Sequence, residues 1–361
     1  ILDDLLEIPK MMLSCLKFYL SPEGENLLRK GSQFVNERKI SRIIFIGHSY
    51  NYFASMIPNY YINSRFRYKI EKICNLNEGI KCDSIESDDF VNGFEPKNNV
   101  FETIFILVSL SGESLQIRES VIKLNELNVD KNLIWAITNN QNSFLAKNSG
   151  FIFPLHSGSE NIFGTKSYVA NILVQYLVAR LFCDESTISK RLEDDIRQLI
   201  FEIKFYGQDW ENHTKNLIEF IGQDYEFLYF ISKGCSMASA YQGALHCKEY
   251  TRKFGEGISL GLFMHGPFQI VNDNFRCVLI IGDEVSVEET INLMELITRK
   301  MGSGKVILIN NSRNLSSLGR GNSNVFVFEH TTKSPYLAPI FEIIVLQFLL
   351  VNMAKIRGVI A

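Results

Sequence analysis

Three serines and a glycine stand where an apolar run changes into a helical pattern, in the stretch FILVSLSGESLQIRESVI at residues 105 to 122. When such a loop begins a helix, its hydroxyl groups, its backbone N–H groups and the helix dipole can all be directed at one phosphate. Ser109, Ser111 and Ser114, with Gly112 between them, therefore predict a phosphate-binding loop. The alternative is an ordinary serine cap of the helix.

A second small polar loop, Gly47, His48 and Ser49 in FIGHSYNYFAS, follows the first predicted strand. Ligands bind at the carboxyl ends of strands in open α/β sheets, so we expect the two loops to converge on one ligand. The alternative for Gly47 is a tight turn that needs glycine, and His48 by itself is more typical of a capping or surface residue. Neither G-x-x-x-x-G-K-[S/T] nor G-x-G-x-x-G is present, which disfavours a nucleotide loop.

A candidate general base comes later, in the helical stretch AYQGALHCKEY. Gln242, His246 and Glu249 recur there at i, i+4 and i+7, which places three polar groups on one helix face. Such a stripe can simply be the solvated face of the helix. The neighbouring residues are small and apolar, however, which favours a helix that lies under a pocket. A carboxylate in that position can have a raised pKa and move protons at neutral pH.

Two further candidates stand in loops. His265 immediately precedes Gly266 and Pro267, and because proline suits the first turn of a helix, the imidazole should lie just ahead of a helix start. An isolated histidine is more often structural. Glu160 stands in the polar loop HSGSENIFGTK, before a long apolar helix that begins near Gly164 or Thr165, and it is either a surface charge or a site group.

Short β-branched runs alternate with helical patterns along the chain, which is typical of parallel sheets covered by helices. The predicted strands form two similar series, at 42–49, 103–109, 132–140 and 151–155, and then at 227–234, 276–284, 305–311 and 325–329. We therefore predict an α/β protein with two copies of one unit, at residues 1–183 and 223–361, joined by a helical link at 184–222. The second copy has DEVSVE where the first has SLSGES, so the first loop should hold an anion and the second should not.

Composition excludes several classes of function. The formal net charge of −3 and the spread of Lys and Arg disfavour nucleic acid as a partner. Seven cysteines, an odd number without a C-x-x-C pair, indicate free thiols in a reducing compartment, and we expect a cytoplasmic protein without a signal peptide. Residues 337–354 are apolar, but Glu342, Gln347 and Asn352 favour a core or interface helix over a membrane span.

Taken in order, these segments resemble the SIS (sugar isomerase) domain, and within it the isomerase domain of glutamine:fructose-6-phosphate aminotransferases. The similarity covers nearly the whole chain. The family motifs G-T-S-Y, S-Q-S-G-E-T, H-A-G-x-E-x-x-V-A-S-T-K-A-F, L-E-G-A-L-K-L-K-E and K-H-G-P-L-A-L-I are matched by GHSY, SLSGES, HSGSENIFGTKSY, YQGALHCKE and MHGPFQIV. The resemblance implies two tandem SIS subdomains, each a parallel sheet between helical layers, in a homodimer.

The resemblance also implies roles for the candidate residues. Ser109, Ser111 and Ser114 would bind a sugar 6-phosphate, with Leu110 in the same loop, and Ser49 and Glu160 would contact the substrate. Glu249 matches the base that moves a proton between C1 and C2. His265 matches the histidine that assists ring opening, often supplied across a dimer interface. No cofactor or metal is implied.

Departures from the family pattern narrow the expected function. Leu110 replaces a glutamine, Gln242 replaces a glutamate, the Glu160 loop is one residue shorter, and the chain ends in IRGVIA rather than in the family's lysine-containing tail. No glutaminase with a leading cysteine precedes Ile1 in the sequence as printed, so the expected reaction is isomerisation with loss of an amine, as in a hexosamine-phosphate deaminase or a fructosamine-phosphate deglycase. The alternatives are isomerisation alone, the isomerase part of a glucosamine-6-phosphate synthase, or a sugar-phosphate-binding regulatory module without turnover.

Overall fold

The computed structural model describes residues 1–72, 80–95, 100–161, 164–222, 225–283, 286–311, 315 and 317–360, with positions 66–72 and 320 described by their backbone alone. The chain divides into two compact units. We call Glu7–Asp194 the N-terminal unit, and Ile1–Leu6 together with Asp195–Ala361 the C-terminal unit.

The N-terminal unit is built on a five-stranded parallel sheet with the order β2-β1-β3-β4-β5. Its strands are β1 (Arg42–Gly47), β2 (Lys81–Glu86), β3 (Thr103–Val108), β4 (Ile134–Thr138) and β5 (Phe151–Pro154). The central strands β3 and β4 are buried throughout because they consist of apolar residues and threonine that face helices on both sides. The edge strand β2 carries charged and polar side chains and is only partly buried.

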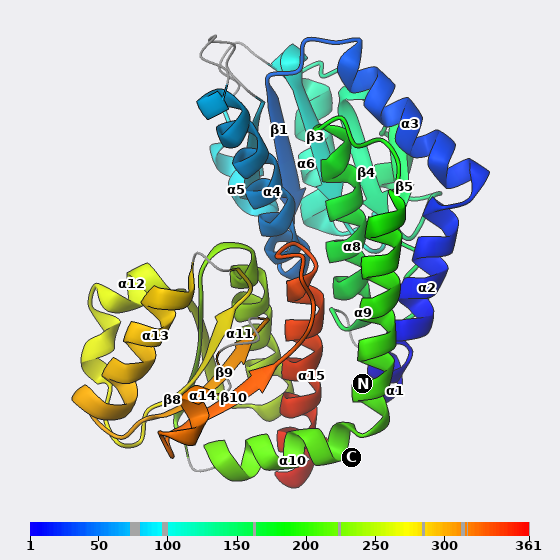
Figure 1. The fold of residues 1–361 in the computed structure, drawn as a ribbon. Helices are drawn as coiled ribbons and strands as arrows, with labels where there is room; N and C mark the ends of the chain where they lie inside the picture. Colours follow the sequence, from blue (N-terminus) through cyan, green and yellow to red (C-terminus); the bar gives the residue numbers. More distant parts are fainter. Residues whose placement is uncertain are drawn as a thin grey trace. The chain divides into compact units, whose positions relative to one another are not determined.

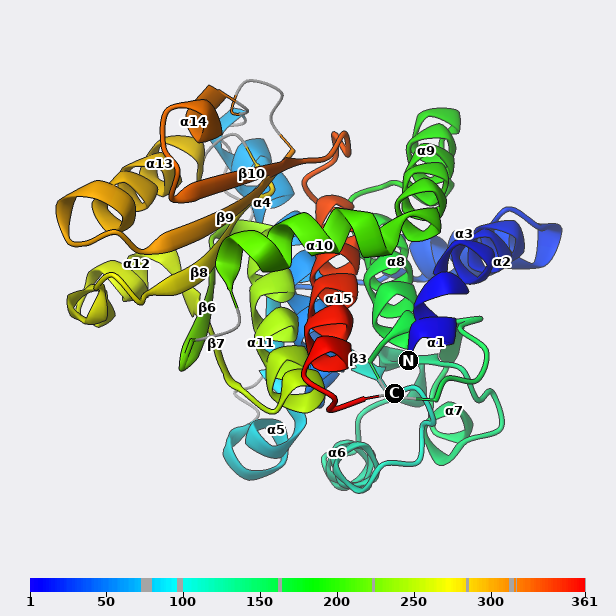
Figure 2. The same cartoon turned by 90° about the horizontal axis from the view of Figure 1, so that it is seen from below.

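Helices cover both faces of this sheet, as Figures 1 and 2 show. One face is covered by α4 (Tyr50–Lys72) and α8 (Lys166–Leu181), which pack against each other, while α2 (Ile8–Tyr19) and α3 (Pro22–Asn36) pack against α8. The other face carries α5 (Ser87–Gly93), α6 (Leu115–Glu126) and α7 (Phe144–Lys147). Short 3-10 turns at Val100–Glu102 and Lys131–Leu133 precede β3 and β4.

The C-terminal unit repeats this plan with the strand order β10-β9-β8-β6-β7, again all parallel. Its strands are β6 (Phe227–Ser232), β7 (Phe254–Ser259), β8 (Arg276–Ile281), β9 (Lys305–Asn310) and β10 (Val325–Glu329). Its helices are α1 (Leu2–Leu6), most of α9 (Lys190–Gln208), α10 (Trp210–Ile221), α11 (Met237–Thr251), α12 (Leu260–Met264), α13 (Val287–Glu295), α14 (Ser317–Arg320) and α15 (Ala338–Ile356). Turns of 3-10 helix at Gly234–Ser236 and Pro267–Ile270 and a π-turn at Leu296–Lys300 complete it. Helices α10, α11 and α15 lie on one face, and α12 and α13 on the other (Figure 2).

The predicted fold class is confirmed, because both copies are parallel sheets between two helical layers. All eight predicted strands are present, several of them a few residues shorter than expected. The edge strands β2 and β7 were not predicted, so the prediction lacked one strand in each sheet. Residues 190–221, within the expected helical link, form α9 (Lys190–Gln208) and α10, while the domain boundaries drawn from the sequence stay a prediction.

Two apolar helices are buried within the chain. Every residue of α8 is buried, and α15 is buried along almost its whole length. Among the described residues, α15 is the one helix long and apolar enough to cross a membrane by length and composition, and a buried core helix passes the same test. The expectation of a core helix at residues 337–354 agrees with this burial. Because both helices are covered inside one chain, neither of them requires a second copy to hide its apolar surface.

Six cysteines lie in the described part of the chain, and all six are free thiols. Five of them are buried and Cys183 is partly buried, while Cys74 lies outside the described residues. Burial raises the pKa of the Cys15 thiol to about 12 and that of Cys247 to about 11. The five buried thiols therefore act as small apolar core groups and not as nucleophiles.

A carboxyl group is fully buried in the first turns of α15. Glu342 accepts hydrogen bonds from the hydroxyls of Ser236 at 2.7 Å and Ser239 at 2.6 Å, both at the start of α11. Burial raises the pKa of Glu342 to about 7, the two serine hydroxyls lower it, and Asp283 adds a further upward influence. A Cβ atom at Gly282 would lie 2.9 Å from this carboxylate, so only glycine fits beside it.

Replacement of Glu342 by glutamine should change how stability depends on pH. An unfolded glutamate titrates near pH ~4.3 and the folded one at about 7, so at intermediate pH the folded state holds a proton that the unfolded state has lost. The free energy of unfolding should therefore fall as pH rises through this window, by about 3 to 4 kcal/mol from this group. Urea unfolding at several pH values should show that Glu342→Gln removes this part of the slope. Glu329→Gln, an exposed control in the same unit, should keep it; equal slopes in the two variants would contradict the assignment.

Candidate functional site

The serine loop joins β3 to α6, as the sequence predicted, but its three serines have different surroundings. Ser109 is buried, and its Oγ accepts a hydrogen bond from the Gly112 N–H at 3.0 Å. Ser111 is exposed, and its Oγ accepts from the Glu113 N–H at 3.2 Å. Ser109 therefore fixes the shape of the loop from below, while Ser111 faces solvent.

Glycine at position 112 is required by the geometry of this loop. Its φ angle of +66° lies in the left-handed region, and a Cβ atom there would lie 2.2 Å from the Ser143 Oγ. The loop is held on the other side by the carbonyl of Leu110, which accepts hydrogen bonds from the Asn139 N–H and the Thr138 hydroxyl. The loop is thus fixed by contacts with the end of β4 before any ligand arrives.

The start of α6 is open. Ser114 occupies the N-cap position, but its hydroxyl makes no capping hydrogen bond with the described part of the chain. The first-turn N–H groups of Leu115, Gln116 and Ile117 likewise make no hydrogen bond to the described residues. The first turn of a helix leaves such donors without partners, and they attract anions. The hydroxyls of Ser111 and Ser114 and the first turn of α6 can therefore hold a phosphate.

The one acidic residue of this loop is neutralised. The Glu113 carboxylate accepts the Phe144 N–H at 2.7 Å through one oxygen and pairs with Arg118 at 2.9 Å through the other. The Arg118 guanidinium in turn lies over the Phe144 ring at 4.4 Å. The carboxylate is thus bound by its own neighbours, and its repulsion of an anion is reduced.

The Ser49 loop lies at the same edge of the sheet. Strand β1 pairs with β3 in parallel, with Gly47 opposite Val108, so His48 and Ser49 leave the sheet beside Ser109. Ser49 has a φ angle of +54°, and its carbonyl accepts from the Tyr52 and Phe53 N–H groups at the start of α4. The two loops therefore lie at one edge of the sheet, as expected. The tight turn, which was the alternative explanation for Gly47, is present as well.

Glu160 caps a helix. Its carboxylate accepts the N–H groups of Gly164 and Ser167 and the hydroxyls of Thr165 and Ser167, at 2.5 to 3.1 Å. These donors form the start of α8, which begins after Thr165 as the sequence predicted. The arrangement favours a structural role for this carboxylate, and its predicted contact with substrate stays a prediction.

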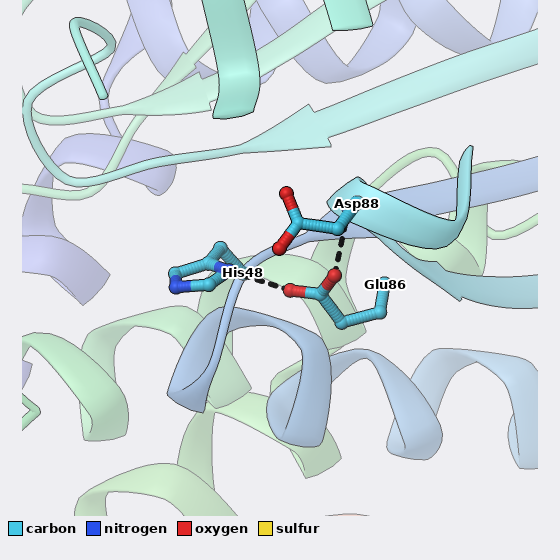
Figure 3. Close-up of side chains that lie close together, drawn as sticks. All are labelled: His48, Glu86 and Asp88. Atoms are coloured by element: carbon cyan, nitrogen blue, oxygen red, sulfur yellow. Dashed lines mark hydrogen bonds and ion pairs between the residues drawn. The ribbon is translucent and has the colours of Figure 1, made fainter. Parts of the chain in front are cut away.

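A polar pair that the sequence did not indicate joins the ends of β1 and β2. The His48 Nδ1 and the Glu86 Oε1 lie 2.6 Å apart, and the second oxygen of Glu86 accepts the Asp88 N–H at 2.7 Å (Figure 3). Possible ligand atoms of all three residues lie within 4.8 Å of one another, a spacing that could suit a metal ion. Because β2 was not predicted, no sequence signal placed Glu86 beside His48.

The predicted polar stripe on α11 does not have one environment. Gln242 and His246 are fully buried with their Nε2 atoms 2.6 Å apart, and Tyr250 stacks on the imidazole with ring centroids 4.6 Å apart. Glu249, in contrast, is exposed near the end of the helix. Desolvation raises the pKa of Glu249, while Arg252 and Lys248 lower it. The direction of the net shift suits a proton-transfer group.

His265 lies where the sequence placed it, between α12 and the 3-10 turn that begins at Pro267, and its side chain is exposed. The second copy's counterpart of the serine loop carries Asp283, which accepts the Ser286 N–H at 2.9 Å ahead of α13. Residues 284 and 285 of that loop lie outside the described part of the chain. A carboxylate at this helix start agrees with the expectation that the second loop does not hold an anion.

Two five-stranded parallel sheets, each between layers of helices, are the arrangement of the sugar isomerase (SIS) fold, and comparisons with known proteins agree. The C-terminal domain of glucosamine-fructose-6-phosphate aminotransferase from Francisella tularensis superposes with a TM-score of 0.77 at 20% identity, over 98% of this chain and 95% of that one. Glucosamine-6-phosphate deaminase from Thermotoga maritima gives a TM-score of 0.66 at 16% identity, over 98% and 95%.

The particular likeness is to the isomerase domain of glutamine–fructose-6-phosphate aminotransferases. The enzyme of that name from Zymomonas mobilis is 24% identical over 364 residues, which is 98% of this chain and 56% of the relative. The chain thus spans about half the length of the curated relatives that it matches. No protein-family model matches the chain. The resemblance that the five motifs predicted is confirmed at the level of fold and relatives.

The cap formed by Glu160 can be tested by its removal. Glu160→Ala leaves the start of α8 without its acceptor, so the free energy of unfolding should fall by about 1 to 3 kcal/mol. Urea unfolding measures this, with Glu119→Ala as the control, because Glu119 is an exposed glutamate in α6 of the same unit. If Glu160 only caps the helix, the affinity for a sugar phosphate should stay close to that of the wild type. A large loss of affinity at unchanged stability would show that Glu160 contacts the substrate.

Proposed function

We propose that the N-terminal unit binds the phosphate group of a hexosamine 6-phosphate or a fructosamine 6-phosphate through the loop at residues 109–114. The observation that carries the proposal is the open start of α6, where the Ser114 hydroxyl and three N–H groups lack partners among the described residues. Ser111 is exposed beside them, and Glu113 is neutralised by Arg118. Among the relatives, proteins named for fructose-6-phosphate and glucosamine-6-phosphate chemistry support this substrate class.

We further propose that the protein is an aldose–ketose isomerase that releases an amine. A base removes the proton from C2 of an open-chain 2-amino aldose and returns it to C1, and water then hydrolyses the resulting C2 imine to a ketose and ammonia. The resemblance gives this proton transfer to Glu249 and the assistance of ring opening to His265. The raised pKa of Glu249 supports the first assignment. Both assignments stay proposals, as do the contacts of Ser49, Leu110 and Glu160 with the sugar.

Two other parts of the prediction depend on the resemblance or on composition. The apolar helices at 166–183 and 337–354 also predicted a dimer, but α8 and α15 are buried within one chain and no longer support it. The homodimer is therefore proposed only from the family's habit of sharing its histidine between subunits. A cytoplasmic location is proposed from the free cysteines. The alternative function, a sugar-phosphate-binding regulatory module, shares the phosphate loop and differs in lacking turnover.

The phosphate loop is tested by the double variant Ser111→Ala with Ser114→Ala. Each hydrogen bond to a charged group contributes roughly 1.5 to 3 kcal/mol, so the affinity for glucosamine 6-phosphate should fall by about two orders of magnitude or more. Calorimetric titration measures it, with unphosphorylated glucosamine as the reference ligand. The matched control is Ser41→Ala, at the opposite edge of the same sheet. An affinity that the double variant leaves intact would remove the phosphate assignment.

The base is tested by Glu249→Gln, which keeps the shape of the side chain and removes the proton acceptor. Turnover should fall by about 10² to 10⁴ while the sugar phosphate still binds, and hydrogen exchange between solvent and C2 should disappear. A general base acts only when it is deprotonated, so wild-type activity should decline as pH falls. Because the pKa of Glu249 is raised, this decline should begin at a higher pH than for an ordinary glutamate. Glu226→Gln, an exposed glutamate in the same unit, is the control. Exchange that persists in Glu249→Gln would place the base elsewhere, and a wild type with neither exchange nor turnover would favour the regulatory module.

A further inference from the structure

The pair formed by His48 and Glu86 has the parts of an acid–base group. Glu86 is held from two sides, because one oxygen caps α5 through the Asp88 N–H and the other faces the His48 Nδ1 at 2.6 Å. The imidazole is thereby held in one orientation, with its second nitrogen on the side of the ring away from Glu86 (Figure 3). The side chain of His48 is 44% exposed, and that of Glu86 is 24% exposed. The free nitrogen can therefore be reached by a ligand.

The position of this pair connects it to the proposed phosphate site. Strand β1 lies between β2 and β3, with Gly47 opposite both Glu86 and Val108. His48 thus leaves the sheet one strand spacing, about 4.8 Å, from Ser109 at the beginning of the phosphate loop. The next residue, Ser49, is proposed to contact the sugar. All of these residues belong to the N-terminal unit.

The chemistry of the pair follows from its hydrogen bond. A carboxylate that accepts from Nδ1–H leaves Nε2 of a neutral ring as a proton acceptor, and the same carboxylate stabilises the ring after it has taken a proton. We infer that His48, oriented by Glu86, carries out both proton transfers that open the pyranose ring of the bound hexosamine 6-phosphate, and that His265 has at most an assisting part in this step. The inference rests on the proposed function of the phosphate loop. It names a residue that the resemblance does not assign, since the family's loop has threonine at this position.

The step needs no further reactant. Nε2 of His48 takes the proton of the C1 hydroxyl as the bond between C1 and the ring oxygen breaks, so that C1 becomes the carbonyl carbon. The imidazolium then returns this proton to the former ring oxygen. Both oxygens are bonded to C1, so one nitrogen can serve both transfers without a large movement. His265 has no carboxylate partner among the described residues, whereas His48 has Glu86 in place.

A metal ion is the competing explanation for the same three side chains. In the structure, however, the His48 Nδ1 lies 2.6 Å from the Glu86 Oε1, and the Glu86 Oε2 accepts the Asp88 N–H. Asp88, which would have to be the third ligand, is exposed. The contacts present thus account for His48 and Glu86 without an ion. Asp88 separates the two explanations, because a metal site needs its carboxylate and the acid–base pair does not.

The experiment measures ring opening apart from later chemistry. The α and β anomers of glucosamine 6-phosphate interconvert through the open chain. Exchange NMR measures the rate of this interconversion with and without the protein. A Glu249→Gln background prevents proton transfer between C1 and C2. In that background, His48→Ala should lower the accelerated rate at saturation by about 10² to 10⁴, and added imidazole should restore part of it. Binding of the open-chain analogue 2-amino-2-deoxyglucitol 6-phosphate should be unchanged, which shows that the variant is folded.

Two further variants complete the experiment, one at Glu86, which positions His48, and one at Asp88, which serves as the control. Glu86→Gln replaces one carboxylate oxygen with an amide N–H₂ group that cannot accept, so the rate at saturation should fall by about tenfold or more at unchanged affinity. Asp88→Asn should leave the rate at its starting value. An unchanged rate in His48→Ala overturns the inference while the phosphate site stands. If EDTA lowers the accelerated rate, Zn²⁺ restores it and Asp88→Asn lowers it as well, the inference is overturned in favour of a metal site. If glucosamine 6-phosphate does not bind the wild type, the proposed function fails and the inference with it.

Discussion

The start of a helix leaves backbone N–H groups without partners, and at the carboxyl edge of a parallel sheet several helices begin side by side. In the N-terminal unit, side chains meet this requirement at three of the helices that follow its strands. Glu86 caps α5, Ser143 caps α7 and Glu160 caps α8. The start of α6 has no such cap. The proposed location of the phosphate site thus follows from which of these helix starts has no side-chain cap.

In the C-terminal unit, carboxylates of the chain lie at two helix starts, although only one of them accepts a backbone N–H. Asp283 accepts an N–H ahead of α13, and the buried Glu342 takes the hydroxyls of Ser236 and Ser239 at the start of α11. A bound carboxylate at these places repels a second anion, and Gly282 leaves no space for one beside Glu342. The two copies therefore differ at the loops that follow β3 and β8. In the loop after β8 the negative charge comes from Asp283 of the chain itself, and in the loop after β3 it comes from a ligand, as we propose.

The sequence predicted the strands that are buried on both sides, since continuous apolar runs such as TIFILV at β3 carry a strong pattern. It did not predict β2 or β7. Strand β2 is half polar, as edge strands commonly are. Strand β7 contains Gly255 and Gly257, which look like turn signals, but side chains there would lie 2.7 Å from the Cys247 Cβ and 2.8 Å from the Ala240 carbonyl oxygen. These glycines let α11 approach the strand closely, a packing requirement without a local signal.

Because strand β2 was not predicted, the sequence could not show that Glu86 belongs to the candidate site. The serine loop, Ser49 and the helix ahead of Glu249 were found because each stands in one continuous motif. Glu86 lies 38 residues from His48, on a strand that was not predicted, so only the sheet register brings the two together. The same limit applies to Glu160, whose role as a cap depends on how its loop folds back on α8, and to Gln242, whose burial with His246 separates it from Glu249.

The composition of the phosphate loop has a consequence for selectivity. Residues 109 to 114 include no lysine or arginine, and the nearby Arg118 is paired with Glu113. A phosphate held there is bound by neutral hydroxyl and N–H donors whose directions are fixed by Gly112, Ser109 and the end of β4. Long-range attraction of any anion by lysines or arginines is strong and depends on salt, whereas directed hydrogen bonds depend on the position of each oxygen. If the loop binds phosphate as we propose, it would select the tetrahedral shape of the group more than its charge, and the sugar attached to the phosphate would be held at a defined distance from His48.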